Sequence, residues 1–247
     1  MFRKSLHADL LKMKRVPITF AHVLIPMITS GLFVIYSSFS VWDGNTKIIA
    51  FYQAVGAGFP VLIGIFTASI MEQEQNAGGC QNLLTSEKKT AAFLAKVFLL
   101  LIFSLFSILL TTVTFWVGLC KILRCSTVSM GIYMMAAFIM WCSSIPLYIW
   151  QMILAFQFGK GVSIGAGILS GLVSVLMLTG LGEHIWKYVF VSWTGRIPYA
   201  YLRTALGESG TVNELEVVMP IYCIVTAASM IYYLLWVSRW EGSNISE

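Results

Sequence analysis

The residue types that catalysis and metal binding require are scarce in this 247-residue chain. Its three histidines, His7, His22 and His184, show no spacing typical of metal ligands. The chain has neither the H-E-x-x-H motif of a zinc protease nor the G-x-S-x-G motif that positions a serine nucleophile. No phosphate-binding loop is present either, because glycine follows Gly159 and Lys160. We therefore expect no catalytic residue and no metal ligand.

Ionisable side chains are almost absent from the long apolar runs of the sequence. None of the eleven acidic residues lies well within such a run, whereas ion-coupled transporters commonly place carboxylates there. Lys96 is the clear exception, and we expect its flexible side chain to lift the ammonium group back to the lipid headgroups. His22 is the second, and we expect a hydrogen-bonded core histidine rather than a ligand. If such a chain moves a cargo uphill, a partner must supply the energy.

The remaining composition is that of a membrane protein. Hydrophobic residues make up 58% of the chain and charged residues 11%, against about 25% charged in an average soluble domain. These proportions argue against a soluble enzyme, a nucleic-acid-binding domain and a disordered protein. The net charge of +5 fits membrane topology instead, because the basic residues concentrate beside the apolar runs.

Six apolar runs are long enough to cross a bilayer, which takes about 20 residues of helix. None alternates with period two, and backbone groups in hydrocarbon must be satisfied within each segment, so helices are predicted. The sequence therefore predicts an all-α membrane protein with a single transmembrane domain over 1–247. The predicted spans are 17–41, 48–71, 90–117, 128–156, 162–182 and 217–237.

Six spans place both termini on the same side of the membrane. Nine Lys and Arg residues lie on that side, five of them within 1–16, against six on the other side in longer segments. Because cytoplasmic segments carry the excess of Lys and Arg, we expect both termini in the cytosol.

The first 16 residues combine apolar and basic side chains at helical spacing. Leu6, Leu10 and Met13 fall near one face of a helix, and basic side chains lie elsewhere. Such a helix can lie in the headgroup layer with its lysines toward anionic lipid. The alternative is an ordinary basic flank that only sets orientation. The residues expected in the interfacial helix are Leu6, Leu10, Lys12, Met13, Lys14 and Arg15.

The connection 72–89 between the second and third spans is polar and too long for a tight turn. The glycines at 78–79 break any continuing helix, and 80–85 could form a short helix with Leu83 and Leu84 exposed. Such a helix suits docking into a groove of another protein, and a solvated loop with a local turn is an equally good interpretation. The candidate docking residues are Glu72, Gln73, Glu74, Gln75, Asn76, Gln81, Asn82, Leu83, Leu84, Thr85, Ser86 and Glu87.

The longest connection on the other side, about 183–216, is rich in aromatic residues with polar edges, which favour the membrane interface. We expect this segment to re-enter the membrane or to lie along the outer leaflet. It is either a plain aromatic belt or a surface that touches an amphipathic, lipid-seeking substrate. The residues of the possible substrate surface are Trp186, Tyr188, Trp193, Arg196, Tyr199 and Tyr201.

Two glycine pairs in the fifth run, Gly161/Gly165 and Gly167/Gly171, have the G-x-x-x-G spacing that lets helices approach closely. We expect these pairs to make contacts within the same subunit rather than a dimer seam.

Two segments of the sequence resemble a known family. Residues 8–15 (ADLLKMKR) are similar to the start of ABC-2-type permeases of bacterial lantibiotic self-immunity exporters. The stretch from Glu72 through 83–86 (LLTS) into Lys96 resembles the cytosolic loop and third span of those permeases. The length, the six spans and the long connection before the last helix also match, so the resemblance covers most of the chain.

This resemblance implies a mechanism and a set of partners. The N-terminal segment would be an elbow helix, and 72–89 would hold the coupling helix that receives the motion of an ABC ATPase. Such systems combine two related permeases, or two copies of one, with a pair of ATPase subunits that bind ATP and magnesium. The substrate would be a cationic antimicrobial peptide expelled from the cytoplasmic membrane of a bacterium, with no cofactor on this chain and no nucleic acid involved.

The leading hypothesis is therefore a non-catalytic permease subunit of an ATP-driven exporter. Two other classes of protein stay open. The first is a membrane sensor or accessory subunit without transport activity, and the second is an intramembrane enzyme that acts on lipid or prenyl substrates. The enzyme would need acidic or histidine clusters at the interface, and the sequence contains none.

Overall fold

A computed structural model describes residues 6–7, 9–10, 18–86, 88–207 and 212–242 of the chain. Within this part, six helices are long and apolar enough to cross a membrane, which confirms the all-α, six-span prediction. The helices that form the spans are α2 (Ile18–Phe39), α3 (Gly44–Asn76), α5 (Lys89–Trp116) continued by the π-helical turn η1 (Val117–Ile122), α6 (Met130–Ser143), α7 (Ile145–Phe158), α8 (Lys160–Leu178) and α10 (Val212–Arg239). The elements outside the spans are α4 (Gln81–Leu84), the 3-10 turns η2 (Gly180–Gly182), η3 (Trp186–Tyr188) and η4 (Phe190–Ser192), and α9 (Trp193–Ala205).

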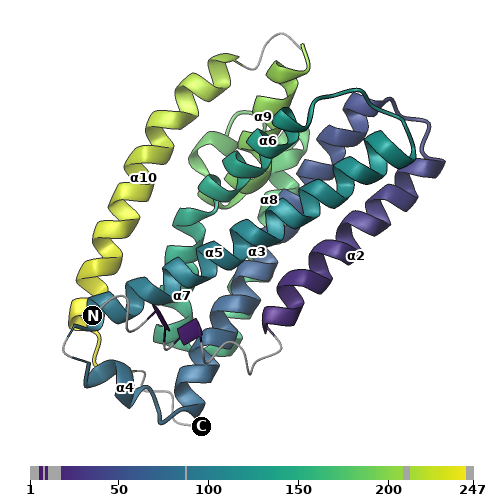
Figure 1. The fold of residues 1–247 in the computed structure, drawn as a ribbon. Helices are drawn as coiled ribbons and strands as arrows, with labels where there is room; N and C mark the ends of the chain where they lie inside the picture. The colour runs from purple at the N-terminus through teal and green to yellow at the C-terminus, as the bar shows by residue number, and fades with distance from the viewer. Residues whose placement is uncertain (1–5, 8, 11–17, 87, 208–211, 243–247) are drawn as a thin grey trace.

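The spans run between two ends of an elongated bundle (Figure 1). One end carries α4 and the last turn of α10, and we call it the α4 end. The opposite end carries the α2–α3 and α5–α6 connections (Figure 1). At the α4 end, Lys89 Nζ lies 3.4 Å from the carbonyl oxygen of Trp240, and Trp236 Nε1 donates to Gln157 Oε1 at 3.0 Å. The connections that the sequence places on one side of the membrane therefore meet at one end.

Helix α3 is longer than the predicted span 48–71, and a cap explains where it begins. The Asp43 carboxylate accepts hydrogen bonds from the backbone N–H groups of Asn45 and Thr46 at 3.1 and 3.4 Å and from the Thr46 hydroxyl. These bonds satisfy N–H groups that have no partner within the helix. The hydrogen bond from the Thr46 side chain is the main reason why the pKa of Asp43 is lowered.

The fourth span is interrupted at Ser144, where α6 ends and α7 begins. Pro146 lies in the first turn of α7 and has no N–H group to donate to the Cys142 carbonyl oxygen, four residues earlier. The Tyr222 hydroxyl of α10 donates to that carbonyl oxygen instead, at 2.8 Å. A side chain from another span thus replaces a backbone hydrogen bond that the membrane interior requires.

Helices α3 and α8 touch through glycines. A Cβ atom on Gly64 would lie 2.8 Å from Cα of Gly167, and one on Gly171 would lie 2.6 Å from a methyl group of Val61. The Gly167/Gly171 pair therefore packs against α3 of the same chain, as predicted. An added Cβ on Gly161 or Gly165 would meet no described atom within 4 Å, so that pair makes no such contact.

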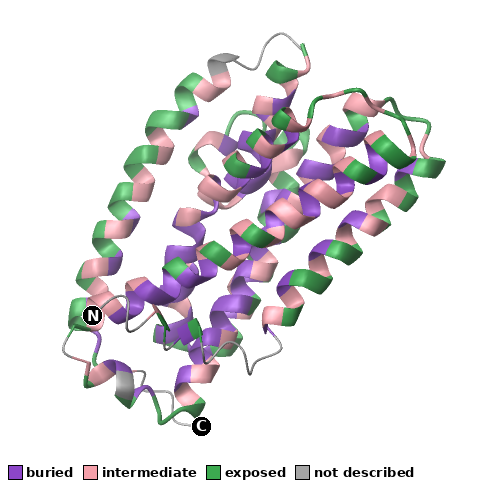
Figure 2. Ribbon diagram, in the orientation of Figure 1, coloured by how far each residue is buried: buried purple, intermediate pink, exposed green. Residues whose placement is uncertain are grey.

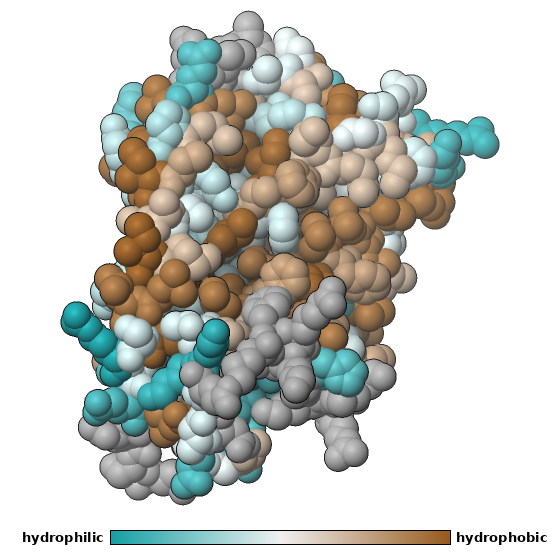
Figure 3. Space-filling view, turned by 60° about the vertical axis from the view of Figure 1, so that its left-hand side comes forward, coloured by the Kyte–Doolittle hydropathy of each residue, from teal (hydrophilic) through white to brown (hydrophobic). Residues whose placement is uncertain are grey.

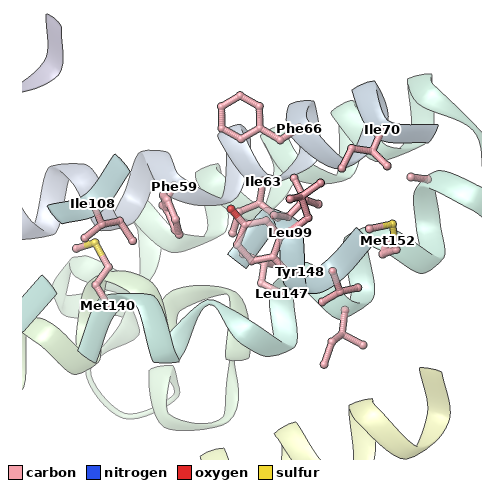
Figure 4. Close-up of a cluster of buried hydrophobic side chains, with 14 of the residues drawn as sticks. Phe59, Ile63, Phe66, Ile70, Leu99, Ile108, Met140, Leu147, Tyr148 and Met152 are labelled. Carbon is pink, nitrogen blue, oxygen red and sulfur yellow. The ribbon is translucent and has the colours of Figure 1, made fainter. Parts of the chain in front are cut away.

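The hydrophobic core lies between α3, α5 and α7, and Figure 4 shows one of its clusters. The outer helices α2, α8 and α10 are little buried, since only 22%, 28% and 17% of the residues in their most apolar stretches are buried. Figure 2 shows this contrast along α10, and Figure 3 shows hydrophobic residues over the middle of one face with hydrophilic residues toward its ends. Exposed apolar surface of this kind suits helices that face lipid or another subunit. The side chains labelled in Figure 4 are Phe59, Ile63, Phe66, Ile70, Leu99, Ile108, Met140, Leu147, Tyr148 and Met152.

Candidate functional site

The short helix α4 is separated from α3 by a turn in left-handed conformation. The φ angles of Gly78, Gly79 and Cys80 are 114°, 60° and 64°, values that an α-helix cannot contain. The predicted glycine break and short helix are thus both confirmed. Glu72, Gln73, Glu74, Gln75 and Asn76, which the sequence assigned to the connection, are instead the last residues of α3.

The two leucines of α4 are not both exposed as predicted. Leu83 is 4% exposed and belongs to the hydrophobic core, and Leu84 is half-buried. Both leucines pack against the core, so the apolar side of α4 anchors the helix to the bundle. Gln81 and Thr85 are exposed, so polar side chains form the outer surface of α4. The side chain of Asn82 and the whole of Glu87 lie outside the described residues.

Lys96 lies at the centre of a buried group of charges beside α4. Its Nζ atom donates to Glu74 Oε1 at 2.7 Å and to Asp9 Oδ1 at 2.9 Å. The side chains of Lys96, Glu74 and Asp9 are 3%, 2% and 10% exposed. The prediction that Lys96 extends to the headgroups is therefore wrong. We call these three residues the ion-paired triad.

The physical reason for the triad is the cost of burying an isolated charge. An ammonium group in an apolar setting costs several kcal/mol unless an opposite charge and hydrogen bonds compensate it. Glu74, on the last turns of α3, lies where it can supply that charge to the early turns of α5. The sequence signal was a lysine early in one span and a glutamate at the end of the preceding span. Asp9 carried no such signal, because its position depends on where the N-terminal segment packs.

A second ion pair at the α4 end is exposed. Lys160 Nζ donates to Glu72 Oε1 at 2.7 Å, which joins the start of α8 to the end of α3. These side chains are 51% and 43% exposed. Solvent screening makes such pairs worth about 0–1 kcal/mol. The Lys160–Glu72 and Lys96–Glu74 pairs have the same N–O distance of 2.7 Å but differ strongly in burial.

The N-terminal segment is described only in part. Residues 6–7 and 9–10 are helical. Leu6 packs against the core, whereas Leu10 is 39% exposed and Asp9 belongs to the triad. The other residues expected in the interfacial helix, Lys12, Met13, Lys14 and Arg15, lie outside the described residues.

The aromatic segment before α10 folds into the bundle at the opposite end from α4. Trp186 and Trp193 have no exposed surface and Arg196 is 4% exposed, so these three residues lie inside the bundle and not on its surface. The two tryptophans pack together in a second hydrophobic cluster, and the Thr194 hydroxyl of α9 donates to the Gly56 carbonyl oxygen of α3 at 2.8 Å. The segment thus packs into this end of the bundle, and its re-entry into the membrane stays a prediction.

Three tyrosines of that segment remain at or near the surface. Tyr188 is 69% exposed, and Tyr199 and Tyr201 are half-buried.

Arg196 is held inside by Nε, which donates to the Met177 carbonyl oxygen at 2.6 Å, and by Nη2, which donates to the Thr179 carbonyl oxygen at 3.2 Å. A cation is favourable there because carbonyl groups at the end of α8 have no helical partners.

His22 is a core histidine, as predicted. Its Nδ1 atom lies 2.8 Å from the Ile18 carbonyl oxygen, and its ring stacks on Phe66 with centroids 4.0 Å apart. No group of three or more His, Cys, Asp or Glu side chains that could hold a metal ion occurs among the described residues. Cys120 and Cys125 are free thiols.

Comparison with known proteins identifies the family. Residues 5–173, more than half of the chain, match the family described as ABC-2 family transporter protein. No curated protein and no solved structure matches the chain. The chain therefore belongs to the ABC-2 transporter family. It is a membrane permease subunit of an ABC transporter, which works with an ABC ATPase subunit, and the matched range includes α4 and the ion-paired triad.

Proposed function

We propose that this chain is the permease of an exporter that expels lantibiotic-type antimicrobial peptides from the cytoplasmic membrane of a bacterium and so provides immunity or resistance. The observation that carries the proposal is α4, a short helix seated on the bundle by Leu83 with its polar side exposed. The similarity of 8–15 and of the stretch from Glu72 to Lys96 to immunity permeases supports the peptide substrate.

In this proposal α4 is the coupling helix, and its exposed side docks into a groove of the ATPase. The ATPase, in two copies, binds ATP and magnesium, and this chain binds neither. Leu83 packs in the core and fixes α4 to it. A displacement of α4 would therefore be transmitted directly to α3 and α5. The α4 end would then face the cytosol, in agreement with the excess of Lys and Arg on that side.

The complex would contain a second permease, either a related chain or another copy of this one. The sparsely buried outer faces of α2, α8 and α10 offer apolar surface for that pairing and for lipid. At the opposite end, Tyr188, Tyr199 and Tyr201 are the members of the predicted substrate surface that a peptide in the outer leaflet could still reach.

Substitution on the exposed side of α4 tests the coupling role. In cells that carry the chain with its ATPase, Gln81→Arg combined with Thr85→Arg should abolish tolerance to cationic lantibiotics, because two bulky cations disturb the docking surface but not the core. The amount of chain in the membrane should not change. The measurements are growth inhibition by a panel of lantibiotics and quantification of the membrane-inserted chain.

The matched control is Thr127→Arg, an exposed threonine in the α5–α6 connection at the opposite end, which should leave tolerance intact. Unchanged tolerance in the α4 double variant would contradict the coupling role. Tolerance that survives a hydrolysis-deficient ATPase would instead favour a sensor or accessory subunit without transport activity.

A further inference from the structure

We propose that the ion-paired triad makes the N-terminal segment follow the movement of α4, with Lys96 as the positioning residue at its centre. The inference rests on the proposed function, because it takes α4 as the place where the ATPase acts. It adds the route by which that movement reaches the N-terminal segment, which no continuous helix connects to α4.

The connection of α4 to the triad is short and direct on both sides. The backbone N–H of Cys80, the residue just before α4, donates to the Glu74 carbonyl oxygen at 3.2 Å. On the other side, α4 lies in contact with α5, the helix that carries Lys96. A displacement of α4 therefore acts on the two helices that supply Glu74 and Lys96.

The third member of the triad brings in a distant part of the chain. Asp9 lies 87 residues before Lys96, yet Asp9 Oδ1 is 2.9 Å from Lys96 Nζ. Three segments thus converge on one ammonium group: the N-terminal segment, the end of α3 and the start of α5. If one segment moved alone, Lys96 would lose one of its two carboxylate partners in a place where its side chain is 3% exposed. Little water reaches these side chains to replace a lost partner, so the three segments move together.

The pair Lys160–Glu72 supplies the contrast within the same end of the molecule. It has nearly the same N–O distance of 2.7 Å, but its side chains are about half exposed. Water can replace either partner, so this pair can open without a large penalty. It is therefore the matched control for an ion pair that does not transmit movement.

Hydrogen–deuterium exchange in the complete complex with the ATPase tests the inference. In the wild-type complex, a non-hydrolysable ATP analogue with magnesium should change the exchange rate of peptides that contain 81–84 and also of those that contain 6–10. In Asp9→Ala the change at 81–84 should persist and the change at 6–10 should be lost. Asp9→Ala keeps the pair between Lys96 and Glu74, so the bundle stays assembled. Lys96→Met should produce the same loss, and Lys160→Met should behave as the wild type.

The outcomes separate the inference from the proposed function. A nucleotide response at 6–10 that persists in Asp9→Ala and Lys96→Met would overturn the inference alone. A wild-type response confined to 81–84 would do the same. The absence of any response at 81–84 in the wild type would overturn the coupling role of α4, and the inference with it.

Discussion

At the scale of single residues, Lys96 shows how a buried cation ties a membrane protein together. Its two carboxylate partners come from segments that the chain separates by 22 and 87 residues. In a setting this dry, removal of one partner from an ion pair costs much more than the pair itself contributes, because the remaining charge stays buried. We therefore expect the free energy of unfolding to fall more when one member of the triad is substituted than when all three are replaced by apolar residues.

Lys96→Met should therefore destabilise the protein by about 3–5 kcal/mol, because the buried ion pairs that Lys96 makes with Glu74 and Asp9 are both lost. Lys160→Met should cost under about 1 kcal/mol, since the pair that it breaks is exposed. The free energy of unfolding in mixed detergent micelles, measured by titration with a denaturing detergent, compares the two. Equal losses in the two variants would show that burial does not set the strength of these pairs.

At the scale of helices, the packing of α3 against its neighbours depends on glycines at the contacts. The backbones of α3 and α8 come so close that a Cβ atom on Gly64 would lie 2.8 Å from Cα of Gly167, and one on Gly167 would lie 3.0 Å from Cα of Gly64. Such contacts replace the hydrophobic driving force, which is weak between helices in lipid. The same reasoning applies to Gly56, where a Cβ would lie 2.5 Å from Cα of Gly195 on α9.

Gly64→Ala should destabilise the bundle by about 1–3 kcal/mol, because the new methyl group would meet backbone atoms of α8 that cannot turn aside. Gly165→Ala, in the other predicted pair, should be neutral or slightly stabilising, since its methyl group meets no described atom and alanine favours helix. Thermal unfolding of both purified variants distinguishes these effects. A loss at Gly165 as large as at Gly64 would contradict the packing described for α8.

At the scale of the whole molecule, the sequence predicted the six spans because apolar length alone defines them. It misplaced features that depend on tertiary contacts. Trp193 resembles an interfacial tryptophan in sequence, but packing against Trp186 and side chains of α10 buries it. Leu83 looked like a docking residue because nothing in the sequence shows that α4 lies against the core. The pairing of Lys96 required three segments to be placed at once, which no local pattern encodes.

The orientation of the bundle can be tested with one native cysteine. Cys125 is exposed at the opposite end from α4, whereas Cys80 is buried at the α4 end. If the α4 end is cytosolic, a membrane-impermeant maleimide should label Cys125 in intact cells, and Cys125→Ser should remove that signal. In a Cys125→Ser background, Gln81→Cys should react only after the cells are permeabilised. Labelling of Gln81→Cys in intact cells would place the ATPase-binding surface outside and contradict the proposed function.

The interruption at Ser144 also has a mechanical consequence. The Tyr222 hydroxyl bonds to the Cys142 carbonyl oxygen, and the two halves of the fourth span are joined through Ser144. The Ser144 N–H donates to the Trp141 carbonyl oxygen at 3.1 Å, and the Ser144 carbonyl oxygen accepts from the Tyr148 N–H at 3.0 Å. A change in the angle between these halves would therefore act on the backbone hydrogen bonds of Ser144 and on the hydrogen bond from Tyr222. The middle of the fourth span is therefore tied to the last helix, and a tilt of α10 would act on the junction between α6 and α7 through the Tyr222 hydroxyl.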